Sequence, residues 1–289
     1  MTEILNRETY ALSDAALEHI FRTRIVPDIV LTNPLMAPQT SPLAAITGGQ
    51  PGSGKSKLIE ALEIYRFKSS ALTISGDDLR HYHPEHERLL HDDPLNAAFY
   101  TDRDSGRWVE MLIDWVSKEV RVNIIIESTM RNPETFRITA KLLRERGYRV
   151  EAHAIAVHPA LSWLGVNLRY EEGLQSSGSA RYTIRASHDA GVAGVPKTLA
   201  AIHDERLADE ITVHSRSHDV LYNNQLEPGG SGWKSPEPPE TIFEQLFAAD
   251  PSPLDAEEIA KGWERATVLM RRRGAPEAEI KRLLEDAAQ

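Results

Sequence analysis

We predict an α/β fold, in which a mostly parallel sheet is covered by helices and a helical extension follows at the C-terminal end. Two observations lead to this prediction. Between residues 43 and 222, short apolar strand patterns alternate with amphipathic helix patterns, as in sheets whose parallel strands are joined by crossover helices. A glycine-rich turn at residues 49–56 joins the first of these strands to the first helix. This order indicates three layers, with ligands bound at the carboxyl ends of the strands.

The elements follow from apolar periodicity and from capping residues. The first helix starts at the capping segment Leu12-Ser13-Asp14 and runs to Arg24, and an irregular segment at residues 33–38 leads into the first strand. We predict strands at residues 43–46, 71–74, 122–126, 150–157, 211–213 and 220–222. We predict helices at residues 57–65, 108–116 and 133–146, and another after Pro159.

Side-chain patterns give more specific expectations for two segments. Leu58, Leu62 and Tyr65 share one face of the helix at residues 57–65, so this face should pack against the sheet. The polar stretch at residues 175–179 contains Gln, Gly and three Ser residues, and we predict that it is mobile.

The chain divides into four parts by composition. These are residues 1–40 (N-terminal helix and linker), 41–226 (the sheet-containing domain), 227–240 (a linker rich in Gly, Pro and Ser) and 241–289 (a helical tail). Helices in the tail are capped at Ser252-Pro253 and Ala275-Pro276. We predict that the run Arg271-Arg272-Arg273 in this tail is a solvated face.

Composition excludes several classes of protein. With 41% hydrophobic and 26% charged residues, the chain of 289 residues is an ordinary globular protein, and its net charge of −10 disfavours nonspecific nucleic-acid binding. It has no cysteine, which excludes disulfides and thiolate zinc sites and suits the cytoplasm, where we expect the protein to act. We find no signal peptide and no apolar run near the ~18 residues of a membrane span, so no membrane partner is expected.

Residues 49–56 form a complete phosphate-loop motif, G-x-x-x-x-G-K-[ST]. They read Gly49-Gln50-Pro51-Gly52-Ser53-Gly54-Lys55-Ser56 and lie between a buried strand and a helix. Glycines allow backbone N–H groups to surround phosphate oxygens, and the helix N-terminus adds partial positive charge. Lys55 would reach the β- and γ-phosphates, and the Ser56 hydroxyl would hold Mg²⁺. The motif predicts that the chain binds a nucleoside triphosphate.

Polar residues near predicted strands and loops are candidates for the remaining chemistry. Asp77 follows the strand at 71–74 and could accept a proton during phosphoryl transfer, although Asp is also a good helix cap. Glu127 ends the most apolar strand and resembles the acid on the Mg²⁺ side of P-loop enzymes, with a polar turn as the alternative. Arg169 and Arg181 flank the Ser-rich stretch and could neutralise a transferred phosphoryl group, or could simply be solvated. Glu110 could face a sugar or lie on an exposed helix face.

Taken in order, these segments resemble the zeta-toxin family of P-loop kinases, from about residue 44 to about residue 224. Besides the phosphate loop, the family's D-x-[FL]-[KR]-x-x-H-P element is matched by Asp77-Asp78-Leu79-Arg80-His81-Tyr82-His83-Pro84. Its I-E-[GS]-T-x-R element is matched by Ile126-Glu127-Ser128-Thr129-Met130-Arg131. Its R-Y-E element is matched by Arg169-Tyr170-Glu171, and its later arginine by Arg181.

The resemblance implies an ATP-dependent kinase with a three-layer P-loop kinase fold. Family members phosphorylate the 3′-hydroxyl of UDP-N-acetylglucosamine, and many are held inactive by a small helical antitoxin. By resemblance, Asp77 is the general base, Lys55 and Ser56 hold the phosphates and Mg²⁺, and Arg169 and Arg181 stabilise the transferred phosphoryl group. The acceptor-binding residues implied in the same way are Arg80, Glu110, Glu127, Thr129 and Arg131.

The sequence departs from the family pattern on the acceptor side. Ser128 stands where Gly is common, Asn132 where Thr often follows the arginine, and Arg80 where Lys is common. NAD, an antibiotic or a polynucleotide end therefore remain alternative acceptors. A nucleotide-binding switch or partner-binding protein is a further alternative, although Asp77 and the arginine pair favour transfer. The tail beyond Tyr222 lies outside the resemblance and could be inhibitory, oligomerising or a decoration.

Overall fold

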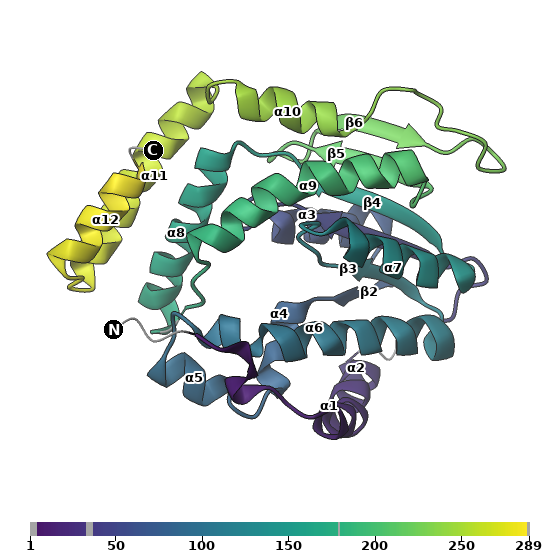
Figure 1. The fold of residues 1–289 in the computed structure, drawn as a ribbon, viewed down its shortest axis with the longest axis horizontal. Coiled ribbons are helices and arrows are strands. Elements are labelled where there is room, and N and C mark those ends of the chain that lie inside the picture. Colours follow the sequence, from purple (N-terminus) through teal and green to yellow (C-terminus); the bar gives the residue numbers. More distant parts are fainter. Residues whose placement is uncertain (1–4, 33–36, 179, 288–289) are drawn as a thin grey trace.

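One six-stranded sheet organises the computed structural model, which describes residues 5–32, 37–178 and 180–287 (Figure 1). The strands are β1 (Leu43–Gly48), β2 (Ala71–Ile74), β3 (Asn123–Ile126), β4 (Arg149–Ile155), β5 (Glu210–His214) and β6 (Val220–Gln225). Their order is β2-β3-β1-β4-β5-β6, and only β5 and β6 pair antiparallel. The predicted mostly parallel sheet is confirmed.

Helices cover both faces of the sheet, which confirms the three-layer fold. They are α1 (Asp14–Ile20), α2 (Val26–Thr32), α3 (Lys55–Ala61), α4 (Gly76–Leu79), α5 (His86–Asp92), α6 (Ala97–Trp115), α7 (Pro133–Glu145), α8 (Pro159–Ser177), α9 (Arg185–Glu205), α10 (Glu240–Ala248), α11 (Pro253–Arg272) and α12 (Glu277–Ala287). One apolar core contains α1, α6, α7, α9 and α10, and the second contains α3, α8, α11 and α12. Side chains of β1 alternate between them: Ala44 and Ile46 face the first core, and Leu43 and Ala45 the second.

The N-terminal and tail helices agree with their predicted caps. The Ser13 hydroxyl accepts a hydrogen bond from the Ala16 N–H at 3.2 Å, and Ser252 caps α11 in the same way. The first helix does not end at Arg24, because a π-helical turn, η2 (Phe21–Ile25), carries it into α2. Residues 33–36 of the predicted linker at 33–38 and tail residues 288–289 lie outside the described residues. Among the described helices, none has the length and apolar character that a membrane span requires.

Two predicted helices differ in extent from those observed. α6 begins at Ala97, well before the predicted start at residue 108. The prediction started too late because the buried positions of this first part include the polar Thr101, Asp104 and Ser105, which interrupt the apolar pattern. α3 continues into a π-helical turn, η3 (Leu62–Arg66), which turns Tyr65 outward. The expected burial of Tyr65 was therefore wrong: its exposed fraction is 81%.

The sequence did not predict α9, which covers the sheet beside α7 (Figure 1). Gly191, Gly194 and Pro196 lie inside it, and both residue types disfavour helix interiors. The polar stretch at 175–179 is partly helical: α8 continues to Ser177, Gly178 ends it with φ of 75°, and Ser179 lies outside the described residues.

Candidate functional site

A cavity of about 530 Å³ opens where β1, β2 and β3 end. Small-molecule sites commonly have this size and lie at the carboxyl ends of parallel strands. It brings together residues from every predicted cluster: Lys55, Asp77, Arg80, Glu110, Glu127, Thr129, Arg131, Arg169 and Arg181. The roles assigned to these residues remain predictions, but the fold places them around one space.

The phosphate loop has the backbone shape that its motif predicts. Gly52 and Gly54 have φ of 80° and 96°, in the left-handed region that favours glycine. Gly52 also lies against α8, where a Cβ on Gly165 would stand 2.6 Å from the Gly52 carbonyl oxygen. Within the described residues, no side chain hydrogen-bonds the N-terminus of α3. The first N–H groups of α3 are thus suited to phosphate oxygens.

Lys55 is buried at the base of this loop. Its Nζ donates hydrogen bonds to the carbonyl oxygens of Gly49 at 2.7 Å and Gln50 at 3.2 Å. Burial, together with the nearby positive charges of Arg169 and Arg181, lowers the pKa of the Lys55 ammonium to about 8. A phosphate at this position would compensate for the lost hydration and favour the charged form.

Two other residues of the phosphate loop differ in their surroundings: Gln50 is buried and supports the loop, whereas Ser56 is exposed. The Gln50 amide donates to the Val157 carbonyl oxygen at 2.7 Å and so fastens the loop to the end of β4. Ser56 is exposed in the first turn of α3 and does not line the cavity. Its hydroxyl is an oxygen ligand of the type that Mg²⁺ prefers, and the phosphates of a bound nucleotide would supply further oxygens.

Asp77 lies in the first turn of α4, but it is not the residue that caps this helix. The Ser75 hydroxyl does so, accepting from the Asp77 N–H at 3.3 Å. The Asp77 carboxylate instead pairs with Arg80, 3.1 Å from its Nε, and with Arg181. Partial burial raises the pKa of the Asp77 carboxyl, but Arg181 and Arg80 outweigh it and hold that pKa below its ordinary value. Asp77 is therefore ionised at neutral pH.

Glu127 joins the ends of two neighbouring strands. Its carboxylate accepts a hydrogen bond from the Ser75 hydroxyl at 2.6 Å, and its N–H donates to the Ile74 carbonyl oxygen at 2.9 Å. The same carboxylate helps to raise the pKa of neighbouring Asp78, after the larger effect of burial. Glu127 thus adds fixed negative charge beside Asp77 at the cavity wall.

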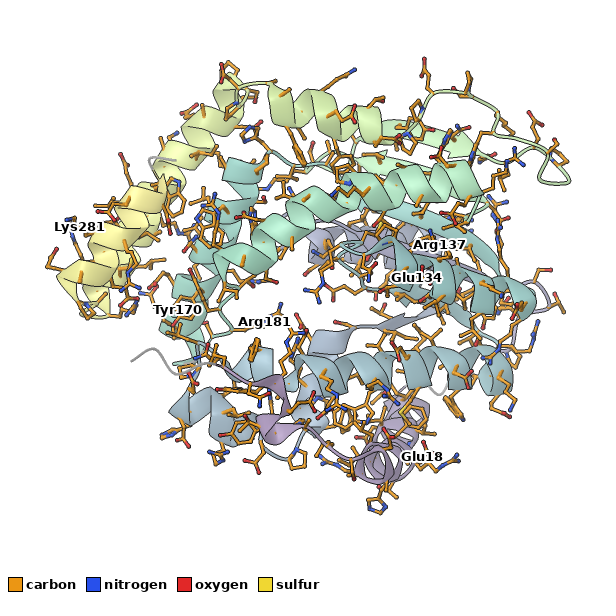
Figure 2. The ribbon with its side chains drawn as sticks, viewed as in Figure 1. Glu18, Glu134, Arg137, Tyr170, Arg181 and Lys281 are labelled. Carbon is orange, nitrogen blue, oxygen red and sulfur yellow. The ribbon has the colours of Figure 1, made fainter. Side chains whose placement is uncertain are left out.

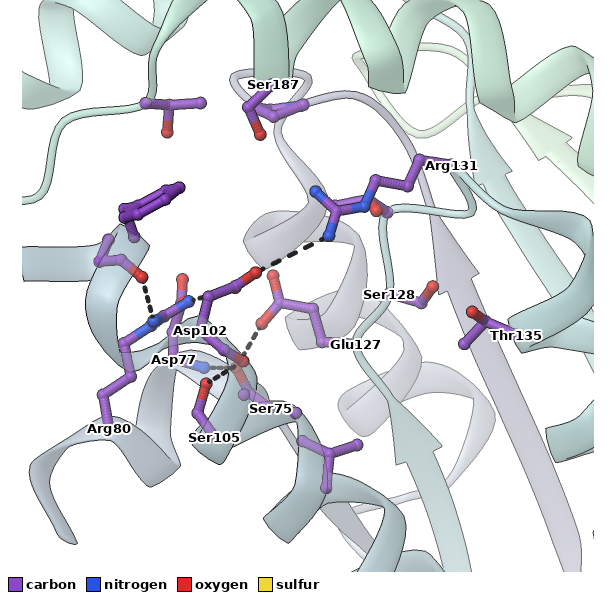
Figure 3. A pocket seen from close by; sticks show the side chains of 18 of the residues that line it. Ser75, Asp77, Arg80, Asp102, Ser105, Glu127, Ser128, Arg131, Thr135 and Ser187 are labelled. Atoms are coloured by element: carbon purple, nitrogen blue, oxygen red, sulfur yellow. Dashed lines mark hydrogen bonds and ion pairs between the residues drawn. The ribbon is translucent and has the colours of Figure 1, made fainter. Parts of the chain in front are cut away.

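Three arginines surround a second carboxylate, Asp102 of α6. Arg80 is 7% exposed and donates to Asp102 from a terminal nitrogen at 2.9 Å. Arg131 and Arg7 lie farther away, with nitrogen–oxygen distances of 3.8 and 3.9 Å. Figure 3 shows Arg80 and Arg131 approaching Asp102 from two sides of the pocket. Because Arg80 also binds Asp77, it links the two carboxylates.

The loop that carries Arg131 is held in an unusual conformation. Met130 has φ of 48°, and its carbonyl oxygen accepts a hydrogen bond from the Thr198 hydroxyl of α9 at 2.6 Å. The Ser128 hydroxyl accepts from the Met130 N–H at 3.0 Å, so this residue stabilises the turn. α9 passes so close that a Cβ on Gly194 would stand 2.3 Å from the Arg131 carbonyl oxygen. The missed helix therefore fixes the position of Arg131.

Glu110 lies at the cavity on an exposed helix face, and its contact with a sugar stays a prediction. Its side chain lines the cavity, yet it is 74% exposed and lies 3.9 Å from Arg107 on the same helix. Thr129 also lines the cavity.

Within the described residues, no group of His, Asp and Glu side chains is arranged to hold a metal ion. His83 pairs with the buried carboxylate of Asp104, at a nitrogen–oxygen distance of 3.2 Å.

Sequence reasoning missed Asp102, Arg7 and Ser75. Asp102 was overlooked because buried polar residues hid the start of α6 from the apolar pattern. Ser75 lies two residues before the recognised motif, which begins at Asp77, and caps α4. Arg7 gave no local signal, because it reaches the cavity from a segment far away in sequence.

Comparison with known proteins agrees with this geometry. The sequence model of the zeta-toxin family matches residues 28–227. The chain belongs to the zeta-toxin family. It is 27% identical to toxin PezT of Streptococcus pneumoniae over 230 residues, which span 79% of this chain and 87% of PezT. It is 30% identical to toxin zeta of Enterococcus hirae over 207 residues, which span 71% of this chain and 70% of that toxin.

Solved structures share the fold of this zeta toxin. A structure from the PezAT toxin–antitoxin system of Streptococcus pneumoniae superposes with a TM-score of 0.74 at 24% identity, covering 90% of this chain and 99% of that one. A complex of AvrRxo1-ORF1 and -ORF2 superposes with a TM-score of 0.54 at 11% identity, covering 96% and 87%. The predicted family and the P-loop kinase type of fold are confirmed.

Proposed function

We propose that this zeta toxin is an ATP-dependent kinase that phosphorylates the 3′-hydroxyl of UDP-N-acetylglucosamine, with Asp77 as the general base. The observation that carries the proposal is the position of Asp77. Its carboxylate lines the same cavity as the phosphate-loop Lys55 and is paired with Arg181. A base, a phosphate-binding loop and an arginine beside the transferred group are parts that recur in phosphoryl-transfer sites.

The Asp77–Arg181 ion pair suggests how the base is released. While paired, Asp77 has a depressed pKa and is a weak proton acceptor. Bound phosphates would attract the Arg181 guanidinium, and the loss of this partner would raise the pKa of Asp77. Asp77 could then take the proton from the acceptor hydroxyl as that oxygen attacks the γ-phosphorus of ATP and the bond to the β–γ bridging oxygen breaks.

We assign the donor side of the reaction to the phosphate loop. Its N–H groups and Lys55 would hold the triphosphate, and Ser56 would hold Mg²⁺, which when bound supplies positive charge beside the phosphates. Arg169 lines the cavity and donates to the Thr183 hydroxyl at 3.3 Å, close to Arg181 in sequence. Both guanidinium groups would stabilise charge on the transferred phosphoryl group.

An anionic nucleotide sugar suits the acceptor end of the cavity. Arg7, Arg80 and Arg131 surround Asp102. Arg80 also pairs with Asp77, so Arg7 and Arg131 are the cations left to bind a diphosphate. Glu110, Glu127 and Thr129 offer oxygen atoms for sugar hydroxyl and amide groups. These features support a nucleotide sugar over a neutral antibiotic.

The test is a transfer assay with the purified protein, ATP and Mg²⁺. UDP-N-acetylglucosamine should gain one phosphate, measured by mass spectrometry, and Lys55→Ala should give no product. NAD, an aminoglycoside and a 5′-hydroxyl oligonucleotide are offered in parallel. Product from one of these alone overturns the substrate assignment, whereas ATP hydrolysis without any phosphorylated acceptor overturns the kinase.

We also propose a helical antitoxin as partner and the cytoplasm as the place of action. The matching PezT fold was solved as part of a toxin–antitoxin system. Growth of a bacterial host that expresses this chain, with and without a candidate antitoxin from the neighbouring gene, tests the partner. Equal growth arrest in both cultures would contradict it.

A further inference from the structure

The C-terminal helices α11 and α12 pack against α8, the helix that carries Arg169. Trp263 and Met270 of α11 and Ile280 and Leu283 of α12 are buried in the same apolar core as the α8 residue Leu164. In Figure 1 these two helices, drawn in yellow, lie beside α8 at one side of the molecule. They lie outside residues 28–227, which the family model matches.

An ion pair between a buried glutamate and a partly exposed arginine supports this packing next to the site. Arg273, at the turn between α11 and α12, donates to both carboxylate oxygens of Glu171, from Nε at 2.7 Å and from a terminal nitrogen at 3.0 Å. The Glu171 side chain is 4% exposed, and Arg273 also pairs with Glu279 of α12. Arg271, Arg272 and Arg273 are all exposed, which agrees with the predicted solvated run, but the Arg273 guanidinium also reaches the buried carboxylate of Glu171 on a different helix.

An aromatic contact continues from this ion pair to the segment that carries Arg181. Tyr170, which precedes Glu171, is buried, and its ring centroid lies 5.0 Å from that of Tyr182 in an edge-on arrangement. Charged residues of α12, among them Asp286, lie near enough to Tyr182 to influence the pKa of its hydroxyl, which burial chiefly raises. In Figure 2, Tyr170 is labelled between α12 and Arg181.

Both arginines of the proposed transfer step depend on the short segment at residues 181–183. Arg181 directly precedes Tyr182, and its guanidinium reaches Asp77. Arg169 donates to the hydroxyl of Thr183, which directly follows Tyr182. Residues 181–183 therefore hold one arginine and position the other, while Tyr182 packs against the core to which α12 contributes.

We propose that α11 and α12 position Arg169 and Arg181 for phosphoryl transfer, with Arg273 as the positioning residue. This inference rests on the proposed kinase function. Arg273 touches neither reactant: it acts through Glu171, Tyr170 and Tyr182. Without it, the buried Glu171 carboxylate would lack its bidentate partner and would draw water toward the contact. The arginines would then be misplaced while the phosphate loop, which meets α8 at Gly165 and not at Glu171, kept its shape.

The test compares Arg273→Gln with Arg265→Gln. Arg265 of α11 pairs with Glu172 of α8 at 2.7 Å, but both side chains are exposed, so this variant removes an ion pair between the same two helices away from Tyr182. Arg273→Gln should lower kcat by about tenfold to a hundredfold and change the KM for ATP by less than about twofold. Arg265→Gln should change neither. Arg273→Lys, which keeps the charge, should recover part of the kcat.

A second measurement does not depend on catalysis. In the full-length protein, Arg273→Gln should accelerate amide hydrogen exchange at residues 181–183 but not at residues 49–56. If the single variant does not fold, Glu171→Gln/Arg273→Gln, which leaves no buried charge, takes its place with the same expected loss of kcat. Unchanged exchange at 181–183 overturns the proposal whether or not the protein is a kinase. Faster exchange with unchanged kcat in an active kinase also overturns it.

Discussion

The proposed donor and acceptor ends of the cavity hold their cations in different ways. Lys55 is 9% exposed, and two backbone carbonyl oxygens within its own loop fix its ammonium. Arg131 and Arg7 have side chains 43% and 50% exposed, and their distances of 3.8 and 3.9 Å to Asp102 exceed a normal hydrogen bond. The donor end is thus preorganised, whereas the acceptor end can rearrange around a ligand. We expect substitutions at the donor end to affect transfer itself, and those at the acceptor end to affect mainly acceptor affinity.

The largest effect should come from Lys55→Ala. Removal of the buried ammonium eliminates charge-assisted contacts that should stabilise the transition state by several kcal/mol, so transfer should fall by about a thousandfold or more. Nucleotide affinity, measured by titration with a fluorescent ATP analogue, should fall too. Wild-type rates in this variant would contradict a preorganised donor end and the kinase itself.

Asp77→Asn should have the second-largest effect on transfer, since Asp77 is the proposed base between the two ends. The amide cannot accept the proton, so kcat should fall by about a hundredfold or more while ATP binding is retained. Asp78→Asn is the matched control, because this neighbour is not paired with Arg181. If Asp78→Asn is instead the inactive variant, the register of the motif is wrong.

A pH titration separates the two ends without mutation. Since burial lowers the pKa of Lys55 to about 8, free protein loses this charge as the pH rises through that value. Apparent affinity for ATP should then weaken by about tenfold between pH 8 and pH 9.5, because binding requires the ammonium. The acceptor KM should stay flat, since arginines keep their charge. If the affinity for ATP and the acceptor KM depended equally on pH, the two ends of the cavity would not differ in this way.

The smallest effect should come from Arg131→Gln and Arg7→Gln. Each loses one exposed cation, so the KM for a nucleotide-sugar acceptor should rise by about threefold to tenfold, with the KM for ATP unchanged. Arg103→Gln serves as the control, because Arg103 pairs with Glu8 at 2.6 Å and does not line the cavity. A lower kcat with unchanged acceptor KM would show that the acceptor end is as rigid as the donor end.

Local sequence determined the donor side and the fold class of this protein. The phosphate loop is eight consecutive residues between a strand and a helix, and its glycines adopt the backbone angles that the motif requires. The apolar strands from residue 43 onward were recognisable because side chains buried on both faces of a parallel sheet leave continuous apolar runs. Asp77 and Glu127 could be named because each follows such a strand.

Only tertiary structure decided the acceptor side and the role of the tail. Asp102 pairs with Arg7, Arg80 and Arg131, which come from three separate segments of the chain. No local sequence pattern indicates that these residues meet. The glycines of α9 argue against a helix by propensity, yet close approach to the phosphate loop and to the Arg131 loop requires them. Arg273 is exposed, as its sequence predicted, but its partner Glu171 lies on α8 and could not be found from the local pattern. A local sequence pattern indicates backbone preference and burial. Contacts between residues far apart in the chain form only when the helices and the sheet pack together.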